Sequence, residues 1–133
     1  MKMNAIEDTE STENEALTHA VIGAAIEVHR ILGPGLLESI YEEALSHELA
    51  LRRLRVERQK AVEVIYKDIV IKGQRLDLLV EDALVVEIKS VSKLPDVAMA
   101  QTLSYLRATG LKRALLMNFG ERLLKDGIKR ISL

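Results

Sequence analysis

Residues 75–91, RLDLLVEDALVVEIKSV, decide the fold of this chain. Two apolar runs flank a short polar turn, which predicts an antiparallel hairpin centred on Asp82. That register pairs Val80 with Leu84 and Leu79 with Val85. It also sets Asp77 directly opposite Glu87, and residues paired in this way have Cβ atoms roughly 4.5–5.5 Å apart. The sequence therefore predicts two acids side by side on one face of a sheet.

Like charges at this separation oppose folding, so the pair of Asp77 and Glu87 predicts a neutralising partner. A divalent cation is the obvious candidate, because hard cations such as Mg²⁺ prefer carboxylate oxygen and water ligands. Lys89 lies two residues beyond Glu87 and therefore projects from the same face of the strand. We expect two carboxylates and one ammonium group to converge on one spot.

A second interpretation makes Glu87 and Lys89 the solvated face of a strand whose other face is apolar, since charged residues are mostly exposed. However, Leu79 shares a face with Asp77, and Val85 shares a face with Glu87. Strands that are apolar on both faces are typical of the centre of an α/β sheet. Charges at such positions are costly unless they are paired or bound to a metal. Both interpretations stay open at this point.

Length and composition describe one globular domain. The chain has 133 residues, of which 48% are hydrophobic and 29% charged, and this excludes a disordered polymer. Its net charge of −1 gives no global basic field for nucleic acid, although a local patch would suffice. Cysteine is absent, which excludes disulfides and thiolate zinc sites and suits a reducing, cytoplasmic location.

The first residues of the chain are acidic. We expect residues 1–12 to form a flexible tail and residues 13–133 to form the single domain. The start lacks the basic and apolar regions of a secretory signal. No apolar run approaches the ~20 residues of a membrane span, so no membrane partner is expected.

Hydrophobic periodicity outlines the remaining elements. Apolar residues recur with helical spacing up to Gly33-Pro34-Gly35, which ends the first helix. Pro95 and Gly110 mark the start and the end of a later helix. The expected elements are helices at residues 14–32, 36–54 and 95–110, and strands at residues 56–66, 69–71, 75–80, 84–89, 113–119 and 128–133. This order, ααββββαββ, indicates an α/β protein with a mixed central β-sheet flanked by helices.

Two helical pairs of polar residues are further candidates. Glu38 and Tyr41 share one helix face, and Gln101 and Tyr105 share another, so helices packed on the sheet can bring both pairs to the acids. Each also has a structural explanation: an acid in a first turn complements the helix dipole, and a tyrosine on an apolar stripe belongs to the core. The histidines lie at no metal-ligand spacing; they are His19, His29 and His47.

These motifs together resemble a known family. Asp77 followed after nine residues by Glu87-Ile88-Lys89 is similar to the metal-binding signature of the PD-(D/E)XK nuclease superfamily. Residues 101–105, QTLSY, resemble the QxxxY element of its RecB-like branch. Residues 35–41, GLLESIY, match the GxxExxY motif that names a group of small bacterial and archaeal proteins. The resemblance covers residues 15–133. Leu76 stands where the signature has proline, which leaves the Asp77 carboxylate in place.

The resemblance implies a restriction-endonuclease-like core and a nuclease, a phosphodiesterase that uses Mg²⁺ or Mn²⁺ to hydrolyse nucleic acid, with DNA expected. Asp77, Glu87 and the main-chain carbonyl of Ile88 would hold the cation, and Lys89 would lie beside the attacking water. Glu38 would reach the hydration shell of the cation or a second ion. Gln101 would steady the site. The weaker candidates for supporting or substrate contacts are Tyr41, Arg75 and Tyr105.

Other functions remain compatible with the sequence. A basic stretch would meet the phosphate backbone if it faces the cleft, or it is a solvated surface; it comprises Arg52, Arg53, Arg55, Arg58 and Lys60. A catalytically inactive module that keeps the fold and binds nucleic acid or a protein is the main alternative. A hydrolase of small phosphoesters is a third. Self-association into a homodimer is compatible with a core of this size.

Overall fold

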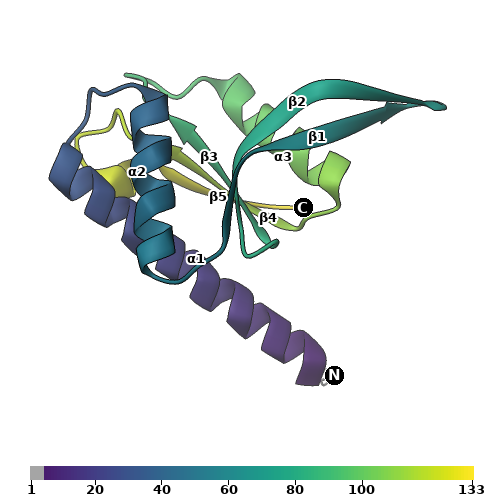
Figure 1. Cartoon of the computed structure of the whole chain (residues 1–133), viewed down its shortest axis with the longest axis horizontal. Coiled ribbons are helices and arrows are strands. Elements are labelled where there is room, and N and C mark those ends of the chain that lie inside the picture. The colour runs from purple at the N-terminus through teal and green to yellow at the C-terminus, as the bar shows by residue number, and fades with distance from the viewer. Residues whose placement is uncertain (1–4) are drawn as a thin grey trace.

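The computed structural model describes the backbone of residues 5–133 and the side chains from Thr12 onward (Figure 1). A five-stranded sheet with the strand order β1-β2-β3-β4-β5 forms its centre. The helices are α1 (Ala5–Leu32), α2 (Glu38–Leu51) and α3 (Asp96–Thr109), and a short 3₁₀ helix, η1, spans Leu124–Gly127. The strands are β1 (Val56–Tyr66), β2 (Ile69–Val80), β3 (Leu84–Lys89), β4 (Arg113–Asn118) and β5 (Ile128–Ser132).

The sheet is mixed, as the sequence predicts. β1, β2 and β3 form an antiparallel meander, β3 and β4 run parallel, and β5 returns antiparallel to β4. The parallel pair requires a crossover, which α3 supplies. This confirms the expected α/β class and restriction-endonuclease-like core. The two strands expected on either side of Gly73 form one strand, because that glycine adopts a φ of 115° and absorbs a register shift between Val62 and Val64.

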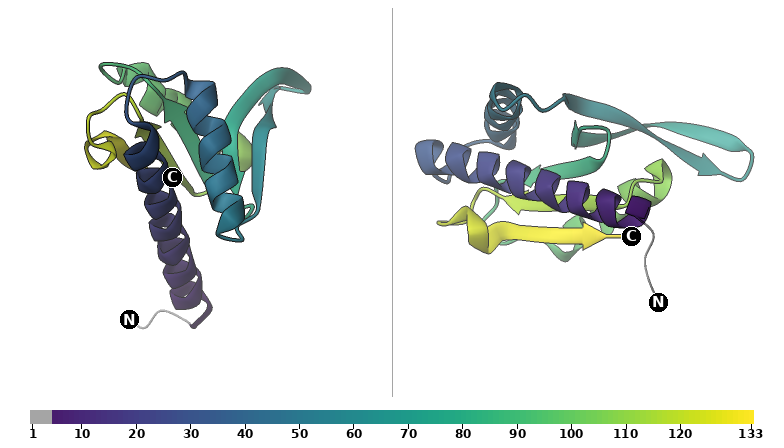
Figure 2. Two further views of the ribbon diagram at one scale, coloured as in Figure 1. Left: turned by 60° about the vertical axis from the view of Figure 1, so that its left-hand side comes forward. Right: turned by 90° about the horizontal axis from the view of Figure 1, so that it is seen from below.

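Helices cover both faces of the sheet (Figure 2). One apolar cluster joins α1 and α2 to one face, and a second joins α3 to the other. Burial on both sides explains why β3 starts with an apolar run, Leu84-Val85-Val86, whose side chains alternate between the two clusters. Within residues 5–133, no helix is both long and apolar enough to cross a membrane.

The first two helices differ from expectation at their ends. α1 begins at Ala5 rather than at residue 14, so the tail expected for residues 1–12 is helical from Ala5 onward, and its flexibility stays a prediction. Residues 1–4 lie outside the described part of the chain. α2 ends at Leu51 rather than at residue 54, because Arg53 adopts a left-handed φ of 64° that a helix does not accommodate.

A buried tyrosine fixes the loop between α1 and α2. Tyr41 is fully buried, and its ring stacks on Phe119 at a centroid distance of 4.6 Å. Its hydroxyl donates to the carbonyl of Gly33 and accepts from the N–H of Leu36 at 3.1 Å. These bonds hold the loop in the shape that starts α2 at Glu38.

Replacing Tyr41 with phenylalanine should loosen this loop. The Tyr41→Phe variant leaves two polar backbone groups without their partner, so its free energy of unfolding should fall by about 1–3 kcal/mol. Urea denaturation followed by circular dichroism measures the change. The matched control is Tyr66→Phe at an exposed tyrosine, which should change stability by less than about 0.5 kcal/mol. Equal losses in the two variants would refute the role of the Tyr41 hydroxyl.

Candidate functional site

The β2–β3 hairpin opens where the two acids lie. Its ladder has the predicted register and pairs Val80 with Leu84, Leu79 with Val85 and Leu78 with Val86. Beyond these pairs, backbone N–H groups of the two strands donate to carboxylates instead of to backbone carbonyls. The N–H of Asp77 donates to Oε1 of Glu87, and the N–H of Ile88 donates to Oδ2 of Asp77, both at 2.8 Å. The strands are therefore bridged by the two carboxylates instead of by a backbone ladder.

Among the candidate site residues, Glu87 has the most strongly shifted pKa. Its side chain lies in the interior, with the residue only 4% exposed. Burial, and then the negative charge of Asp77, raise the pKa of Glu87 to about 8 against the opposing charge of Lys89. A nearby cation would reverse this effect, which agrees with the neutralising partner expected from the sequence.

A pocket opens beside Asp77 towards α2. It has a volume of about 380 Å³ and is lined by Glu38, Ser39, Glu42, Gln59, Asp77 and Ile88. The pocket brings Glu38 and Asp77 together from different elements, as the motifs suggest. Glu38 is exposed at the first turn of α2, so its carboxylate is open to solvent and ions.

Two further residues of this pocket, Glu42 and Gln59, are not part of the predicted site. Glu42 is buried, and its carboxylate pairs with Arg58 at 3.1 Å. Gln59 Nε2 donates to Oε1 of Glu42 at 2.6 Å and to Oδ1 of Asp77 at 3.3 Å, and so links α2 to β2. A signal for Glu42 was present, since it follows Glu38 by four residues on the same helix face. No sequence signal marks Gln59, because its position depends on a left-handed φ of 52° within β1.

The α3 side of the site holds a second group of candidates. Tyr105 is buried, and its hydroxyl accepts from Gln74 Nε2 at 2.7 Å. Burial, and then the charge of Glu87, raise the pKa of Tyr105. Gln101 lies with Tyr105 on the wall of a separate groove. Lys89 is half-buried, and its charge acts on Glu87.

Tyr41 and Arg75 both make hydrogen bonds to main-chain atoms. Tyr41 lies in the core and does not line the pocket beside Asp77; its hydroxyl contacts the loop before Glu38. Arg75 is exposed, and its guanidinium donates to the main-chain carbonyl of Gln59 at 2.8 Å. Both side chains hold backbone that positions the site.

The basic stretch is largely occupied within the chain. The ion pairs join Arg52 to Glu48, Arg55 to Glu81 and Asp82, Arg58 to Glu42, and Lys60 to Glu57. The pairs between exposed side chains are weak and exchange readily, so they leave a phosphate contact open, whereas Arg58 is held by the buried Glu42. They favour the interpretation of this stretch as a solvated surface.

The carboxylate oxygens of the candidate site suit a hard cation such as Mg²⁺. In the described part of the chain, no three histidine, cysteine, aspartate or glutamate side chains form a group that would hold a metal alone. This argues against a site built entirely from such ligands there. Mg²⁺ instead keeps several waters and needs only one or two carboxylates, and Asp77 and Glu87 are two neighbouring carboxylates of this kind.

The raised pKa of Glu87 predicts how stability depends on pH. The folded protein keeps a proton on Glu87 up to about pH 8, whereas the unfolded chain loses it near pH 4.5. In EDTA, stability should therefore fall as pH rises through this window, by up to a few kcal/mol. Urea denaturation across the window should show that Glu87→Gln removes this contribution and that the exposed control Glu43→Gln keeps it. Identical pH profiles for Glu87→Gln and wild type would contradict the assignment.

Comparisons with known proteins agree with the geometry. The model of the PD-(D/E)XK nuclease superfamily matches residues 15–131. Searches of curated proteins and of solved structures found no match. The GxxExxY group and the RecB-like branch stay a resemblance of motifs. Since the superfamily match spans nearly the whole domain and the sheet presents its acids at the β2–β3 opening, the chain belongs to the PD-(D/E)XK nuclease superfamily.

Proposed function

We propose that this chain is a metal-dependent phosphodiesterase that hydrolyses nucleic acid, with DNA as the expected substrate. Mg²⁺ or Mn²⁺ would be held by Asp77, Glu87 and the main-chain carbonyl of Ile88. The observation that carries the proposal is the pair of reciprocal hydrogen bonds that fixes both carboxylates between β2 and β3. Membership of a nuclease superfamily gives the reaction class.

The two acids keep carboxylate lone pairs free for a cation. A carboxylate offers about four lone-pair positions. The N–H of Asp77 uses one of them on Glu87. On Asp77, the N–H of Ile88 uses one on Oδ2 and Gln59 Nε2 uses one on Oδ1. The same bonds hold the carboxylates in place before a ligand arrives, which lowers the entropic cost of binding.

A bound divalent cation would polarise a phosphoryl oxygen and lower the pKa of a coordinated water. Three other side chains would each have a separate role. Lys89 would orient the attacking water and stabilise the negative charge that develops on the phosphate. Glu38, across the pocket from Asp77, would hold a water of the hydration shell or a second ion. Gln101, beside Tyr105, would steady the α3 side.

A catalytically inactive module is the second candidate. Two observations favour it: the described side chains form no three-residue metal group, and the basic stretch is largely paired internally. Such a module would bind nucleic acid or a protein through the same fold. Metal binding and cleavage, measured separately, distinguish it from an enzyme.

The cleavage assay uses single-stranded, duplex and branched DNA with Mg²⁺ or Mn²⁺. Wild type should cut at least one of these substrates, and Lys89→Ala should lower kcat by about 10²–10³-fold, because a charge-stabilising group is lost. The exposed Lys125→Ala is the matched control and should keep wild-type activity. Wild type that cuts no faster than Lys89→Ala would remove the enzyme proposal for these substrates.

Metal binding is measured by calorimetry and by Mn²⁺ electron paramagnetic resonance. Asp77→Asn should abolish the binding seen in wild type, because a neutral amide replaces a charged ligand. Asp126→Asn, at an exposed acid on η1, should bind as wild type does. If Asp77→Asn retains full affinity, the proposed ligand set is wrong. Metal bound without cleavage would favour the inactive module.

A further inference from the structure

Strands β1 and β2 continue beyond the rest of the sheet as a two-stranded arm, residues 62–74 (Figures 1 and 2). β3 pairs with β2 only over Leu78–Val80, and β1 is an edge strand, so the arm has no third strand beside it. The arm pairs Val64 with Ile71, Ile65 with Val70 and Tyr66 with Ile69. A two-stranded ribbon is marginally stable in water unless another surface covers it.

The arm exposes large apolar side chains on both faces. The exposed fractions are 41% for Val64, 72% for Ile65, 58% for Tyr66, 53% for Ile69, 50% for Val70 and 46% for Ile71. Paired residues share a face, so one face carries Val64, Tyr66, Ile69 and Ile71. We call it the inner face, because it continues from Val62 in the cluster packed under α3. The inner face is apolar up to the tip, where Lys67 Nζ lies 5.5 Å from the centroid of the Tyr66 ring. Apolar patches of this kind mark interaction surfaces.

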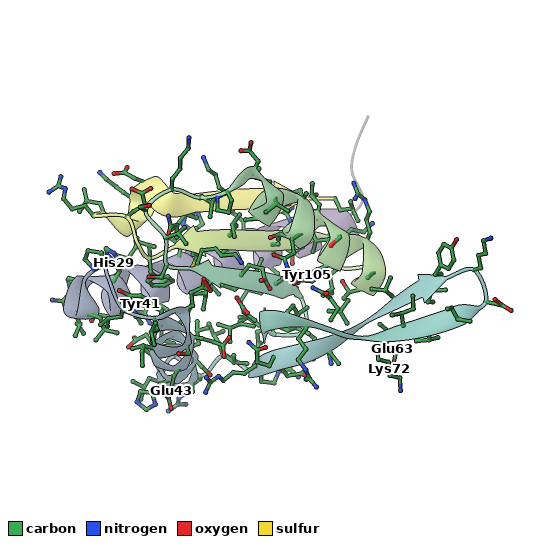
Figure 3. The ribbon with its side chains drawn as sticks, turned by 90° about the horizontal axis from the view of Figure 1, so that it is seen from above. His29, Tyr41, Glu43, Glu63, Lys72 and Tyr105 are labelled. Atoms are coloured by element: carbon green, nitrogen blue, oxygen red, sulfur yellow. The ribbon has the colours of Figure 1, made fainter. Side chains whose placement is uncertain are left out.

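The outer face of the arm is different. It carries Ile65 and Val70, and Glu63 and Lys72 lie on the side that points away from Tyr105 (Figure 3). Charged side chains keep the outer face in water. The two faces therefore differ in what they can bind.

A groove runs between the root of the arm and α3. It has a volume of about 650 Å³, with Val62, Val64 and the acid Glu63 on the arm side and Tyr105 and Ala108 on the helix side. Arg107 also lines it and is exposed. At the tip of the arm, Asp68 is exposed as well. Among the side chains described, neither Asp68 nor Arg107 forms an ion pair.

We propose that the arm is the interface between two copies of this chain. The arms pack inner face against inner face, in opposite directions, about a twofold axis. An axis at the level of residue 65 brings residue 68 of one arm to the level of residue 62 of the other, where the groove lies. Each Asp68 then faces the partner's Arg107.

Charge and shape select a second copy as the occupant. A twofold interface needs a surface that complements itself, and the largely apolar inner face does so. The acid at the tip and the base at the groove are also complementary, and one symmetry operation satisfies both ion pairs at once. The groove includes Gln101, so the tip of each arm closes the α3 side of the other copy's candidate site. The interface itself does not depend on nuclease activity.

Charge reversal tests the pairing by sedimentation velocity of the full chain over a range of concentrations. Wild type should form a reversible dimer. Asp68→Arg alone and Arg107→Asp alone should each weaken it by about tenfold or more, because like charges then meet. An equimolar mixture of the two variants should restore the dimer, since every reversed charge meets its opposite. Wild type that is monomeric throughout, or a mixture no stronger than either variant, overturns the proposal.

Two neighbouring arm residues with matched exposure test which face is buried. Ile69→Lys on the inner face should give monomers, whereas Val70→Lys on the outer face should associate as wild type does. Circular dichroism checks that both variants stay folded. Equal effects of the two substitutions would contradict packing by the inner face and point to a different occupant.

Discussion

Two carboxylates occupy the place of a backbone ladder at the centre of this fold. Asp77 and Glu87 each accept a main-chain N–H from the neighbouring strand, and these bonds end the regular pairing of β2 with β3. The surrounding structure depends on this opening. Gln59 links Asp77 to Glu42 on α2, and Tyr41 fixes the loop from which α2 starts. The acids are held by hydrogen bonds from three elements before any ligand binds.

This arrangement costs stability in the absence of a cation. Burial and the neighbouring charge raise the pKa of Glu87 to about 8. Near neutral pH the buried group therefore either keeps its proton or is charged at a cost in folding stability. Structures tolerate such a cost where a ligand offsets it, and perturbed acids therefore gather at functional sites. The electrostatics and the superfamily membership support the same proposal by independent routes.

Much of the fold could be predicted because its signals are local. The turn at Asp82 fixed the register of β2 and β3, and Pro95 and Gly110 marked α3. The network around Glu42 and Gln59 could not be predicted, because it depends on a left-handed residue inside β1 and on the packing of α2 against β1. The exposure of the arm could not be predicted from the sequence either. The arm's consecutive apolar residues are typical of a strand that is covered on both faces, and only the tertiary structure shows that nothing in the described chain covers them.

The candidate site and the arm meet at α3. Tyr105 and Gln101 lie between the buried acids and the groove at the root of the arm. If two copies pair through their arms, each would close one side of the other's site. The dimer interface and the candidate site would then both include residues of α3.

A crystal structure with Mn²⁺, phased at the metal's absorption edge, tests the central claim most directly. An anomalous peak about 2.0–2.2 Å from oxygens of Asp77 and Glu87 and from the carbonyl of Ile88 is the expected result. A map with no peak between β2 and β3, or with the metal bound elsewhere, would contradict it.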